Sequence, residues 1–568
     1  MLGLELVDWV VIAVYLLGIT FIGLWAVRKV RSSASFFIGD RKFGKVMMAF
    51  FMFGSGTHSD QAVSVSAKTY STGVSGIWYQ WLWLFVTPFF WLIAPFFRRM
   101  RAVTTGDFFE VRYGRSVSGL YAAMGILPLT IALGVMLKGS GAMVEAVSGG
   151  AISSNLAIIA MTVIFLIYGI AGGLSAAIAT NFVQGLLTIV LSFLILPFAL
   201  DRVGGMSGLR QSISDPHKLS LVSPGEITLF YIIIIAFNAL VGWVTMPETM
   251  ANCAAGKTEM EGRTGVTVGI FGKRICTIAW MLTGLCAVVM YTQLADPDLA
   301  YGTMARDLLP GIAPGLIGLF IACMLASIMS TCDSLMVVAS ALFTGNIYKK
   351  FFVVGRADKH YTLIGRTASA LVVILGIFVA FNLESVVKGL EFYWMVSALM
   401  GIAFWAGLFW RRATAAAAWA ATLTSLGVFL FISEKPLGVI PWDFNAHFAD
   451  KLPAFMLWED KLYLPWQMII YLSAGFIVMV VVSLLTKRVP AENLDRFYAC
   501  LRTPIGPNEP ESEPFTLPPG VQPGPRNVLI QHPDFEIPRP TLLGIGGFLA
   551  AWVGVGLLIG AVYWIIQG

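Results

Sequence analysis

Long apolar runs follow one another along almost the whole chain, separated by short polar stretches. A run of roughly 20 apolar residues is long enough to cross the hydrocarbon core of a bilayer as one helix. The pattern therefore predicts an all-α integral membrane protein with about fourteen transmembrane helices. We expect these helices near residues 7–27, 46–70, 77–97, 116–146, 154–171, 176–199, 227–247, 267–291, 312–345, 367–383, 386–408, 413–432, 466–486 and 541–565.

Two of these helices are interrupted by residues that suit a plain lipid-facing helix poorly. The second has two glycines and several polar residues over 54–61, and the seventh has Asn238, Gly242, Trp243 and Pro247. Glycine weakens a helix, and polar groups need partners where water is absent. Interruptions at matching places in two halves are typical of transporters built from inverted repeats. Close helix packing could also explain the two glycines alone.

The ninth predicted helix carries four hydroxyl side chains that share one face, because they recur at three- and four-residue spacing. They are Ser327, Ser330, Thr331 and Ser334, and Asp333 lies beside them. Hydroxyl oxygens and carbonyls freed at an unwound helix would make an oxygen cage suited to Na⁺. An intramembrane carboxylate is itself a candidate functional group. The alternative is that the hydroxyls bond back to their own helix or hold helices together.

Composition and charge agree with a membrane protein and narrow the function. The 568 residues are 57% hydrophobic and 12% charged, whereas soluble domains carry roughly 25% charged residues. The net charge of +6 comes from short basic loops between apolar runs, which indicates orientation in a membrane and not nucleic-acid binding. The sequence contains no CxxC pair, histidine cluster, phosphate-binding loop or catalytic triad. We therefore expect neither an enzyme nor an organic cofactor.

Lys and Arg gather in the loops 28–45, 98–115 and 346–366, which fall on one side if fourteen helices alternate. That side is predicted to be cytoplasmic, which places both termini outside. We expect a leading helix and loop over 1–45, an inverted-repeat core over 46–408 with halves 46–200 and 227–408, two helices over 409–486 with an external loop at 433–465, a proline-rich cytoplasmic tether over 487–540 and a final helix over 541–568.

Four stretches make the chain resemble the sodium/solute symporter family. They read FIGDR at 37–41, TGDFFEVRYG at 105–114, GGL and then TNFVQ between 172 and 184, and MSTCDS and then NIYK between 329 and 349. The resemblance covers residues 1–432. It implies a five-plus-five inverted-repeat core of the leucine-transporter type, with one helix before it and three after. It also implies a sodium site formed by the carbonyls of Gly54, Thr57 and Ser327 and the hydroxyls of Ser330 and Thr331.

One position departs from the family pattern. The third motif usually has an aspartate, which supports sodium binding in the family, where this chain has Asn181. In some members that aspartate forms a second cation pocket with a serine pair, which here reads Asp333-Ser334. We hypothesise that the carboxylate has moved from the sixth helix to the ninth, which keeps one negative charge in the pocket. The alternative is that Asn181 abolishes a cation site and that Asp333 lines the pore.

The solute is expected beside the interrupted helices, near the middle of the membrane. The candidate residues are His58, Asp60 and Gln61 on the second helix, Asn238 and Trp243 on the seventh, and Glu391 and Tyr393 on the eleventh. Trp243 has an equal claim as a packing aromatic. Amide, imidazole and carboxylate groups suit a small polar solute, but they do not choose between a sugar, a polyol and an amino-acid-like zwitterion.

The sequence thus favours a secondary transporter in the cell membrane that imports a small polar solute with Na⁺ by alternating access. Proton coupling through Asp333 stays open. A sensor that kept the transporter fold is disfavoured because 487–568 has no room for a kinase, and an enzyme built on His58 and Asp60 lacks a nucleophile or metal set. The expected partners are the solute and the lipid bilayer, and we expect a functional monomer.

Overall fold

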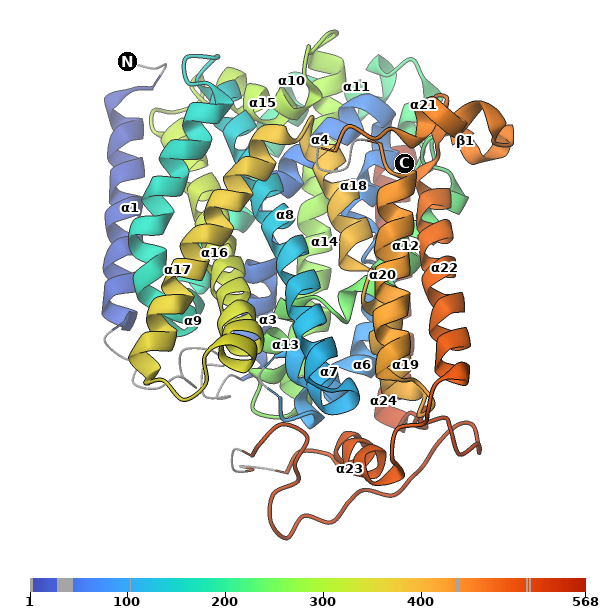
Figure 1. The fold of residues 1–568 in the computed structure, drawn as a ribbon. Coiled ribbons are helices and arrows are strands. Elements are labelled where there is room, and N and C mark those ends of the chain that lie inside the picture. Colours follow the sequence, from blue (N-terminus) through green and yellow to red (C-terminus); the bar gives the residue numbers. More distant parts are fainter. Residues whose placement is uncertain (1–3, 28–43, 103, 435–439, 507–508, 510–511) are drawn as a thin grey trace.

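The computed structural model describes residues 4–27, 44–102, 104–434, 440–506, 509 and 512–568. Within its helices, the side chains of 23–27, Ser55, 164–165, 167–182, Ala251 and Asp358 lie outside that description. The described chain is mostly helical, and its long helices run between two opposite faces of the molecule (Figure 1). This confirms the predicted all-α class.

The first part of the chain contains two spans that are each divided into a pair of helices, and an interruption was predicted only for the first of them. Its helices are α1 (Leu6–Val27), α3 (Lys45–Gly56), α4 (Ser59–Thr72), α5 (Trp78–Trp81), α6 (Thr87–Arg99), α7 (Thr105–Tyr113), α8 (Arg115–Val147), α9 (Ser154–Leu194), α10 (Leu196–Arg202) and α11 (Gly205–Ser212), with 3₁₀ turns η2 (Gly73–Ile77) and η3 (Pro216–Leu219). The span predicted near 46–70 is divided into α3 and α4, and the span near 77–97 into α5 and α6.

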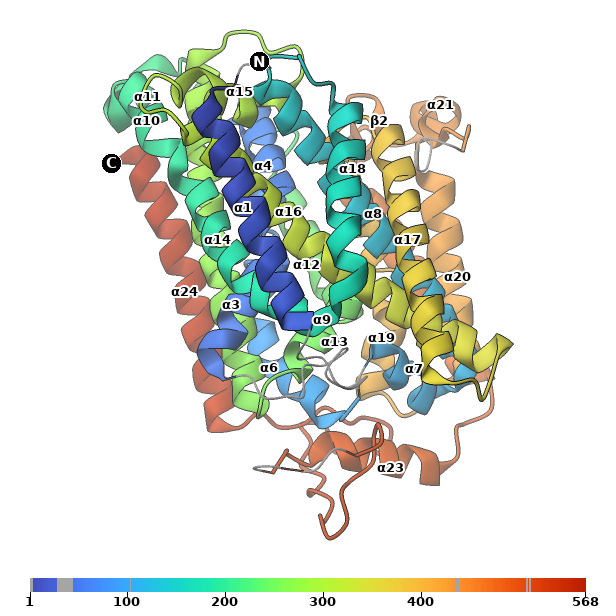
Figure 2. The same ribbon diagram turned by 90° about the vertical axis from the view of Figure 1, so that its left-hand side faces the viewer.

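Helix α9 covers both of the spans predicted near 154–171 and 176–199. Its 41 residues would extend about 60 Å as a straight helix, at 1.5 Å per residue, twice the thickness of a bilayer core. Both of its ends lie toward the face that carries α10 and α15 (Ala300–Leu308) (Figure 2). The segment therefore crosses the molecule and returns, which the two predicted spans require.

The second part of the chain repeats the pattern of an interrupted helix followed by long spans. Its elements are α12 (Leu229–Trp243), α13 (Pro247–Ala254), α14 (Glu259–Met290), η4 (Pro297–Leu299), α15, α16 (Leu316–Ala341), the π-helix η5 (Leu342–Phe352), α17 (Asp358–Asn382), α18 (Val386–Ser397), α19 (Gly401–Phe409), α20 (Ala415–Ile432), α21 (Phe444–Phe448), η7 (Ala449–Lys451), η8 (Ala454–Met456), β1 (Leu457–Trp458), β2 (Lys461–Leu462), α22 (Leu464–Leu485), α23 (Ala491–Arg502) and α24 (Leu542–Gln567). Helices α12 and α13 meet at an angle of 65°.

Among the described residues, nine helices are long and apolar enough to cross a membrane, and the bent pair α12–α13 makes a tenth. Three shorter apolar helices, within α1, α3 and α9, add to them. Many of these helices expose leucine, isoleucine, valine and phenylalanine on the outside of the bundle. Such a surface requires lipid around it, so the protein is a multi-pass membrane protein, and the total of fourteen spans stays a prediction.

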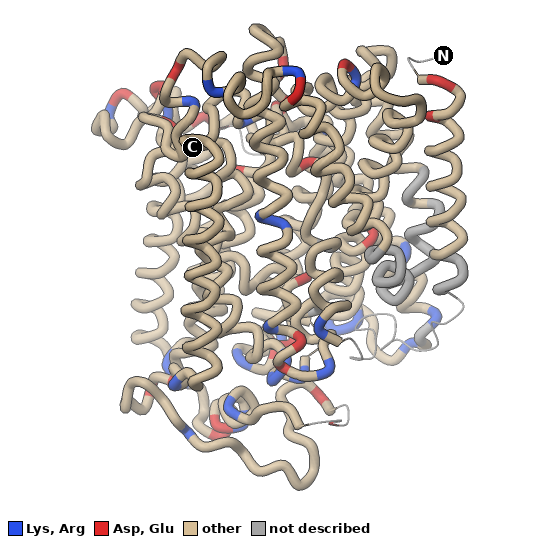
Figure 3. The backbone as a smooth tube through the Cα atoms, turned by 180° about the vertical axis from the view of Figure 1, so that it is seen from behind, with Lys and Arg blue, Asp and Glu red and all other residues tan. Residues whose placement is uncertain are grey.

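Charged residues gather at the two ends of the bundle and are sparse between them (Figure 3). Arg98 and Arg99 lie at the end of α6 and Arg112 in the last turn of α7, at the end of the bundle that also carries α23 (Figure 1), while other Lys and Arg residues lie at the opposite end (Figure 3). The predicted loop 28–45 lies mostly outside the described residues. Helix α1 begins, and α24 ends, toward the opposite face (Figures 1 and 2).

Helix α14 packs tightly against the interrupted pair α3 and α4 because it has glycines on the facing side. A Cβ atom at Gly269 would lie 2.8 Å from the Cβ of Met52 and 2.9 Å from the carbonyl oxygen of Ala49. One at Gly284 would lie 2.8 Å from the Cα of Ser66. Small residues at helix interfaces permit this close approach in membranes. Gly265, Gly269 and Lys273 follow at four-residue spacing, so Lys273 points along the same face toward the interruption.

The proline-rich segment 487–540 is packed against the bundle and is not the extended tether that we expected (Figures 1 and 2). Its helix α23 buries Phe497 against Phe108 and Phe515. Arg101 donates two hydrogen bonds to Glu509, at 2.6 and 2.9 Å. Burial opposes ionisation of Glu509, but the hydrogen bonds from Arg101 and the Gly506 amide outweigh it and lower the pKa of that carboxyl. Aromatic packing and this ion pair hold a segment that contains little regular structure.

We predict that Gly269→Ala lowers the melting temperature of the detergent-purified protein, by an overpacking cost of about 1–3 kcal/mol. The new methyl group would collide with the backbone of α3. Gly272→Ala is the matched control, since its Cβ would meet only the Phe53 ring at 3.4 Å and the gain in helix propensity is the same. Equal melting temperatures for the two variants would contradict the close contact.

Candidate functional site

The site is built around two residues at which the helix α3–α4 is unwound. Thr57 and His58 have extended backbone conformations, with φ/ψ of −122°/115° and −133°/160°. The last carbonyls of α3 therefore lack helical partners. The Gln61 side chain bridges the gap, donating to the carbonyl of Gly56 at 3.2 Å and lying 3.1 Å from His58 Nδ1. The predicted interruption is thus present, and its polar residues replace the missing helical bonds.

The hydroxyl face of α16 lies directly against this unwound turn. Ser330 Oγ donates to the carbonyl of Gly54, and Ser327 Oγ to the carbonyl of Thr57, both at 3.4 Å. Thr331 Oγ1 donates to the Ser327 carbonyl at 3.5 Å, and these side chains are almost fully buried. The five residues predicted to bind sodium therefore meet in one place. Their oxygens are neutral, a donor set that suits a hard monovalent cation.

Asp333 and Ser334 project from α16 in different directions. Ser334 Oγ donates to the Ser330 carbonyl at 3.1 Å, and Ser334 lines a cavity beside the unwound turn. Asp333 is buried, is not among the residues lining that cavity, and lies close enough to Tyr15 on α1 for an electrostatic interaction. Gln184 on α9 also contacts Tyr15. Asp333 therefore lies near Tyr15 of α1, the residue that Gln184 of α9 also contacts.

The Asn181 side chain lies outside the described residues. Gln184 follows it on the same helix, α9. Gln184 Nε2 approaches the Tyr15 hydroxyl at 3.5 Å. The helix carrying Asn181 and the carboxylate of Asp333 thus approach the same tyrosine.

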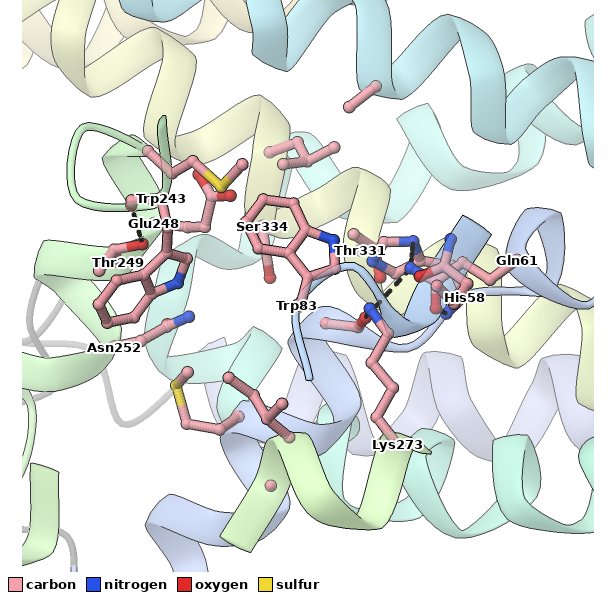
Figure 4. Close-up of a pocket in the computed structure, with 18 of the residues that line it drawn as sticks. His58, Gln61, Trp83, Trp243, Glu248, Thr249, Asn252, Lys273, Thr331 and Ser334 are labelled. Carbon is pink, nitrogen blue, oxygen red and sulfur yellow. Dashed lines mark hydrogen bonds between the residues drawn. The ribbon is translucent and has the colours of Figure 1, made fainter. Parts of the chain in front are cut away.

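A cavity opens beside the unwound turn and extends to the bend between α12 and α13 (Figure 4). Five of the seven predicted substrate residues line it: His58, Asp60, Gln61, Trp243 and Tyr393. Trp243 also stacks on Phe90, with ring centroids 3.5 Å apart, so both of its proposed roles, lining and packing, are present. The wall of the cavity also includes Trp83, Trp394, Asn252 and Thr249.

The other two predicted substrate residues are not among those lining the cavity. Asn238 donates to the carbonyl of Trp394 at 2.9 Å and accepts a hydrogen bond from Tyr471. Glu391 accepts from the Tyr79 hydroxyl at 2.5 Å and from Lys388 at 3.0 Å. The polar atoms of Asn238 and Glu391 are already hydrogen-bonded to other residues of the protein. These bonds hold helices together and leave the two side chains with a structural role.

Three charged residues lining the cavity were missed in the sequence: Glu248, Lys273 and Arg274. Lys273 donates from Nζ to the carbonyl of Gly56 at the unwound turn, and Arg274 donates to the carbonyl of Gln80. The sequence did contain the signal, since both basic residues lie inside the predicted apolar helix 267–291. Ionisable residues inside membrane spans are functional candidates by default.

Within the described part of the chain, no group of three or more His, Cys, Asp or Glu side chains could hold a metal ion. All six cysteines are buried thiols. The oxygens gathered at the unwound turn are carbonyls and hydroxyls. They suit a weakly bound alkali cation better than a transition metal.

An unwound membrane helix, an opposing hydroxyl face and an adjoining polar cavity define a secondary membrane transporter. The chain belongs to the sodium:solute symporter family, whose model matches residues 36–425. This confirms the resemblance noted in the sequence, and the family consists of transporters.

Three comparisons illustrate the relationship. A sodium/glucose cotransporter of Vibrio parahaemolyticus is 24% identical over 77% of this chain and 87% of its own. An osmoregulated proline transporter of Bacillus subtilis (strain 168) is 24% identical over 71% of this chain and 83% of its own. The solved structure of a Na⁺-coupled sialic acid symporter superposes with a TM-score of 0.71 at 17% identity, covering 86% of this chain and 99% of that one. The fold is therefore shared with a leucine-transporter-type symporter.

We predict that Lys273→Met lowers the melting temperature by a cost of about 1 kcal/mol, because it removes one of the two side-chain donors, beside Gln61, to the Gly56 carbonyl at the unwound turn. Lys359→Met, at an exposed position near the start of α17, is the control for loss of one lysine charge. The interpretation is wrong if the two variants melt at the same temperature.

Proposed function

We propose that the protein imports a small polar organic solute together with Na⁺ by alternating access. The observation that carries the proposal is the meeting of the Gly54 and Thr57 carbonyls with the hydroxyls of Ser327 and Ser330 beside a polar cavity. A cation bound there would fix the unwound turn that also presents His58, Asp60 and Gln61 to the solute. Each ligand would then tighten binding of the other.

The assignment of Na⁺ rests on the donor chemistry and on the relatives. The ligands are the carbonyls of Gly54, Thr57 and Ser327 and the hydroxyls of Ser330 and Thr331. Relatives named as sodium/glucose and proline transporters support a small polar solute. We place the protein in the cell membrane as a monomer, with the basic face in the cytoplasm and both termini outside.

On the opposite face from the basic loops, the structure provides contacts that would hold the outer side closed. Lys68 on α4 pairs with Glu226, which precedes α12, and its ammonium lies 5.1 Å from the centre of the Tyr79 ring. The cavity extends from the unwound turn toward α13, at the other end of the molecule (Figures 1 and 4). Alternating access would break the Lys68–Glu226 pair as the inner end closes.

Proton coupling is the second candidate within the same fold. Asp333 favours it, because a buried carboxylate can carry a proton and Asn181 replaces the usual family aspartate. The relocation of that carboxylate from α9 to α16 keeps one negative charge between the two helices. Under this proposal Asp333 and Ser334 serve a second cation, while Asn181 contributes only an amide.

The sodium site is tested by melting the purified protein in NaCl and in KCl at equal ionic strength. A cation that binds only the folded state raises its melting temperature by mass action. We expect a sodium-specific rise for the wild type and none for Ser330→Ala/Thr331→Ala. Ser340→Ala is the matched control, since that hydroxyl bonds only within its own helix, to the Val337 carbonyl at 2.9 Å. If the double variant keeps the sodium-specific rise in melting temperature, Ser330 and Thr331 are not sodium ligands.

Relocation of the carboxylate makes a separate prediction. Asp333→Asn should raise the Na⁺ concentration needed for half of the stabilisation by about tenfold or more, because a buried charge loses its partner. Asn181→Asp should be tolerated better. If Asp333→Asn responds to Na⁺ like the wild type, the relocation is wrong. If the wild type responds to pH and not to Na⁺, proton coupling takes its place.

A further inference from the structure

Glu248 is held at the cavity by the bend between α12 and α13. It is the second residue of α13, after Pro247, and the helices meet at 65°. Thr245 Oγ1 donates to the carbonyls of Gly242 and Ser397, at 2.8 and 3.2 Å, and Thr249 Oγ1 donates to the carbonyl of Trp243 at 3.0 Å. These bonds fix the bend, and Figure 4 shows Glu248 beside Trp243 and Thr249.

One oxygen of the Glu248 carboxylate is buried without a partner among the described residues. Its Oε2 atom is buried and forms no hydrogen bond with any described residue, and no described basic side chain lies within 4.0 Å. By contrast, Glu391 pairs with Lys388, Glu509 with Arg101, and Glu536 with Arg411. A carboxylate at the first turn of a helix is stabilised as the anion. Burying it without a counter-charge is costly, so the loaded state should supply one.

The surroundings of Glu248 suit an organic cation better than a metal ion. Trp243 and Asn252 line the same side of the cavity as Glu248 (Figure 4), and Tyr393 lies close enough to Glu248 for an electrostatic interaction. Aromatic faces attract ammonium groups, whereas hard metal cations require several oxygen ligands. The cluster of carbonyl and hydroxyl oxygens lies instead at the unwound turn, with Ser330 and Thr331.

The opposite end of the cavity carries the ammonium of Lys273, together with Asp60, whose Oδ1 atom lies 3.3 Å from Nδ1 of His58. Lys273 lies on the side of His58 and Gln61, away from Glu248 (Figure 4), and its ammonium donates to a neutral carbonyl. A neutral sugar or polyol would need hydroxyl partners and no separated charges. A cavity with an anion at one end and a cation at the other complements a zwitterion.

We propose that the transported solute is an amino-acid-like zwitterion, whose cationic nitrogen binds the Glu248 carboxylate and whose carboxylate lies toward Lys273. This inference rests on the proposed symport and names its substrate class. It makes Glu248 a specificity-determining residue, because a buried carboxylate left unpaired by a neutral solute disfavours that solute.

The test is a melting-temperature screen of the full chain in saturating NaCl. One panel contains the neutral amino acids and glycine betaine, and the other contains hexoses and myo-inositol. We expect a zwitterion to stabilise the wild type and the neutral panel to have no effect. In Glu248→Gln the affinity for that zwitterion should fall by about tenfold or more, while Glu248→Asp retains part of it. Glu384→Gln, at an exposed carboxylate, is the control.

Without solute, Glu248→Gln should melt at the same temperature as the wild type or higher, since it removes an uncompensated charge. A large fall would show a structural partner for Glu248 and overturn the proposal. Stabilisation by a sugar or polyol, an unchanged zwitterion affinity in Glu248→Gln, or no response to either panel would also overturn it. The rise in NaCl over KCl, read in the same samples, reports separately on the proposed sodium site.

Discussion

The unsatisfied backbone at Thr57 and His58 is the constraint around which the molecule is organised. In a bilayer, every carbonyl and amide group needs a partner within the protein. Gln61 bridges the gap from its own helix, while Ser327 and Ser330 approach from α16 and Lys273 from α14. These contacts determine which faces of three helices turn inward. The glycines of α14 then allow the approach that brings Lys273 within reach.

The same arrangement places the two proposed ligands beside one structural element, the unwound turn. The unwound turn offers oxygens to α16 on one side and polar side chains to the cavity on the other. Under the proposed symport, the cation and the solute would not need to touch each other to be coupled, because both would bias the conformation of that turn. The bend between α12 and α13, just before Glu248, forms another wall of the cavity. Hydrogen bonds from hydroxyl groups to backbone carbonyls hold this wall in place without a solute.

Sequence patterns were sufficient for features that depend on composition along one helix. The interruption at Gly54–Gln61, the hydroxyl face of α16 and the spans within α9 could all be predicted because local periodicity determines them. Features that depend on partners distant in sequence could not. From the sequence, Asn238 was predicted to bind the solute, but in the structure its amide oxygen accepts a hydrogen bond from Tyr471. The prolines of 487–540 predicted an extended segment. In the structure Phe497 and Phe515 stack on each other in a buried position, which no local sequence pattern indicates.

Helix α24 returns to pack beside α6, although about 450 residues separate them. Phe89 contacts Phe548 with ring centroids 5.4 Å apart, and Trp91 Nε1 donates to the Leu543 carbonyl at 3.1 Å. Helix α24 is therefore synthesised after α6 and covers one of its faces. Until α24 has been synthesised and inserted, that face of α6 must be covered by lipid or by another protein surface. The order of the elements along the chain therefore sets the order in which this face can assemble: α6 first, then the segment 487–540, then α24.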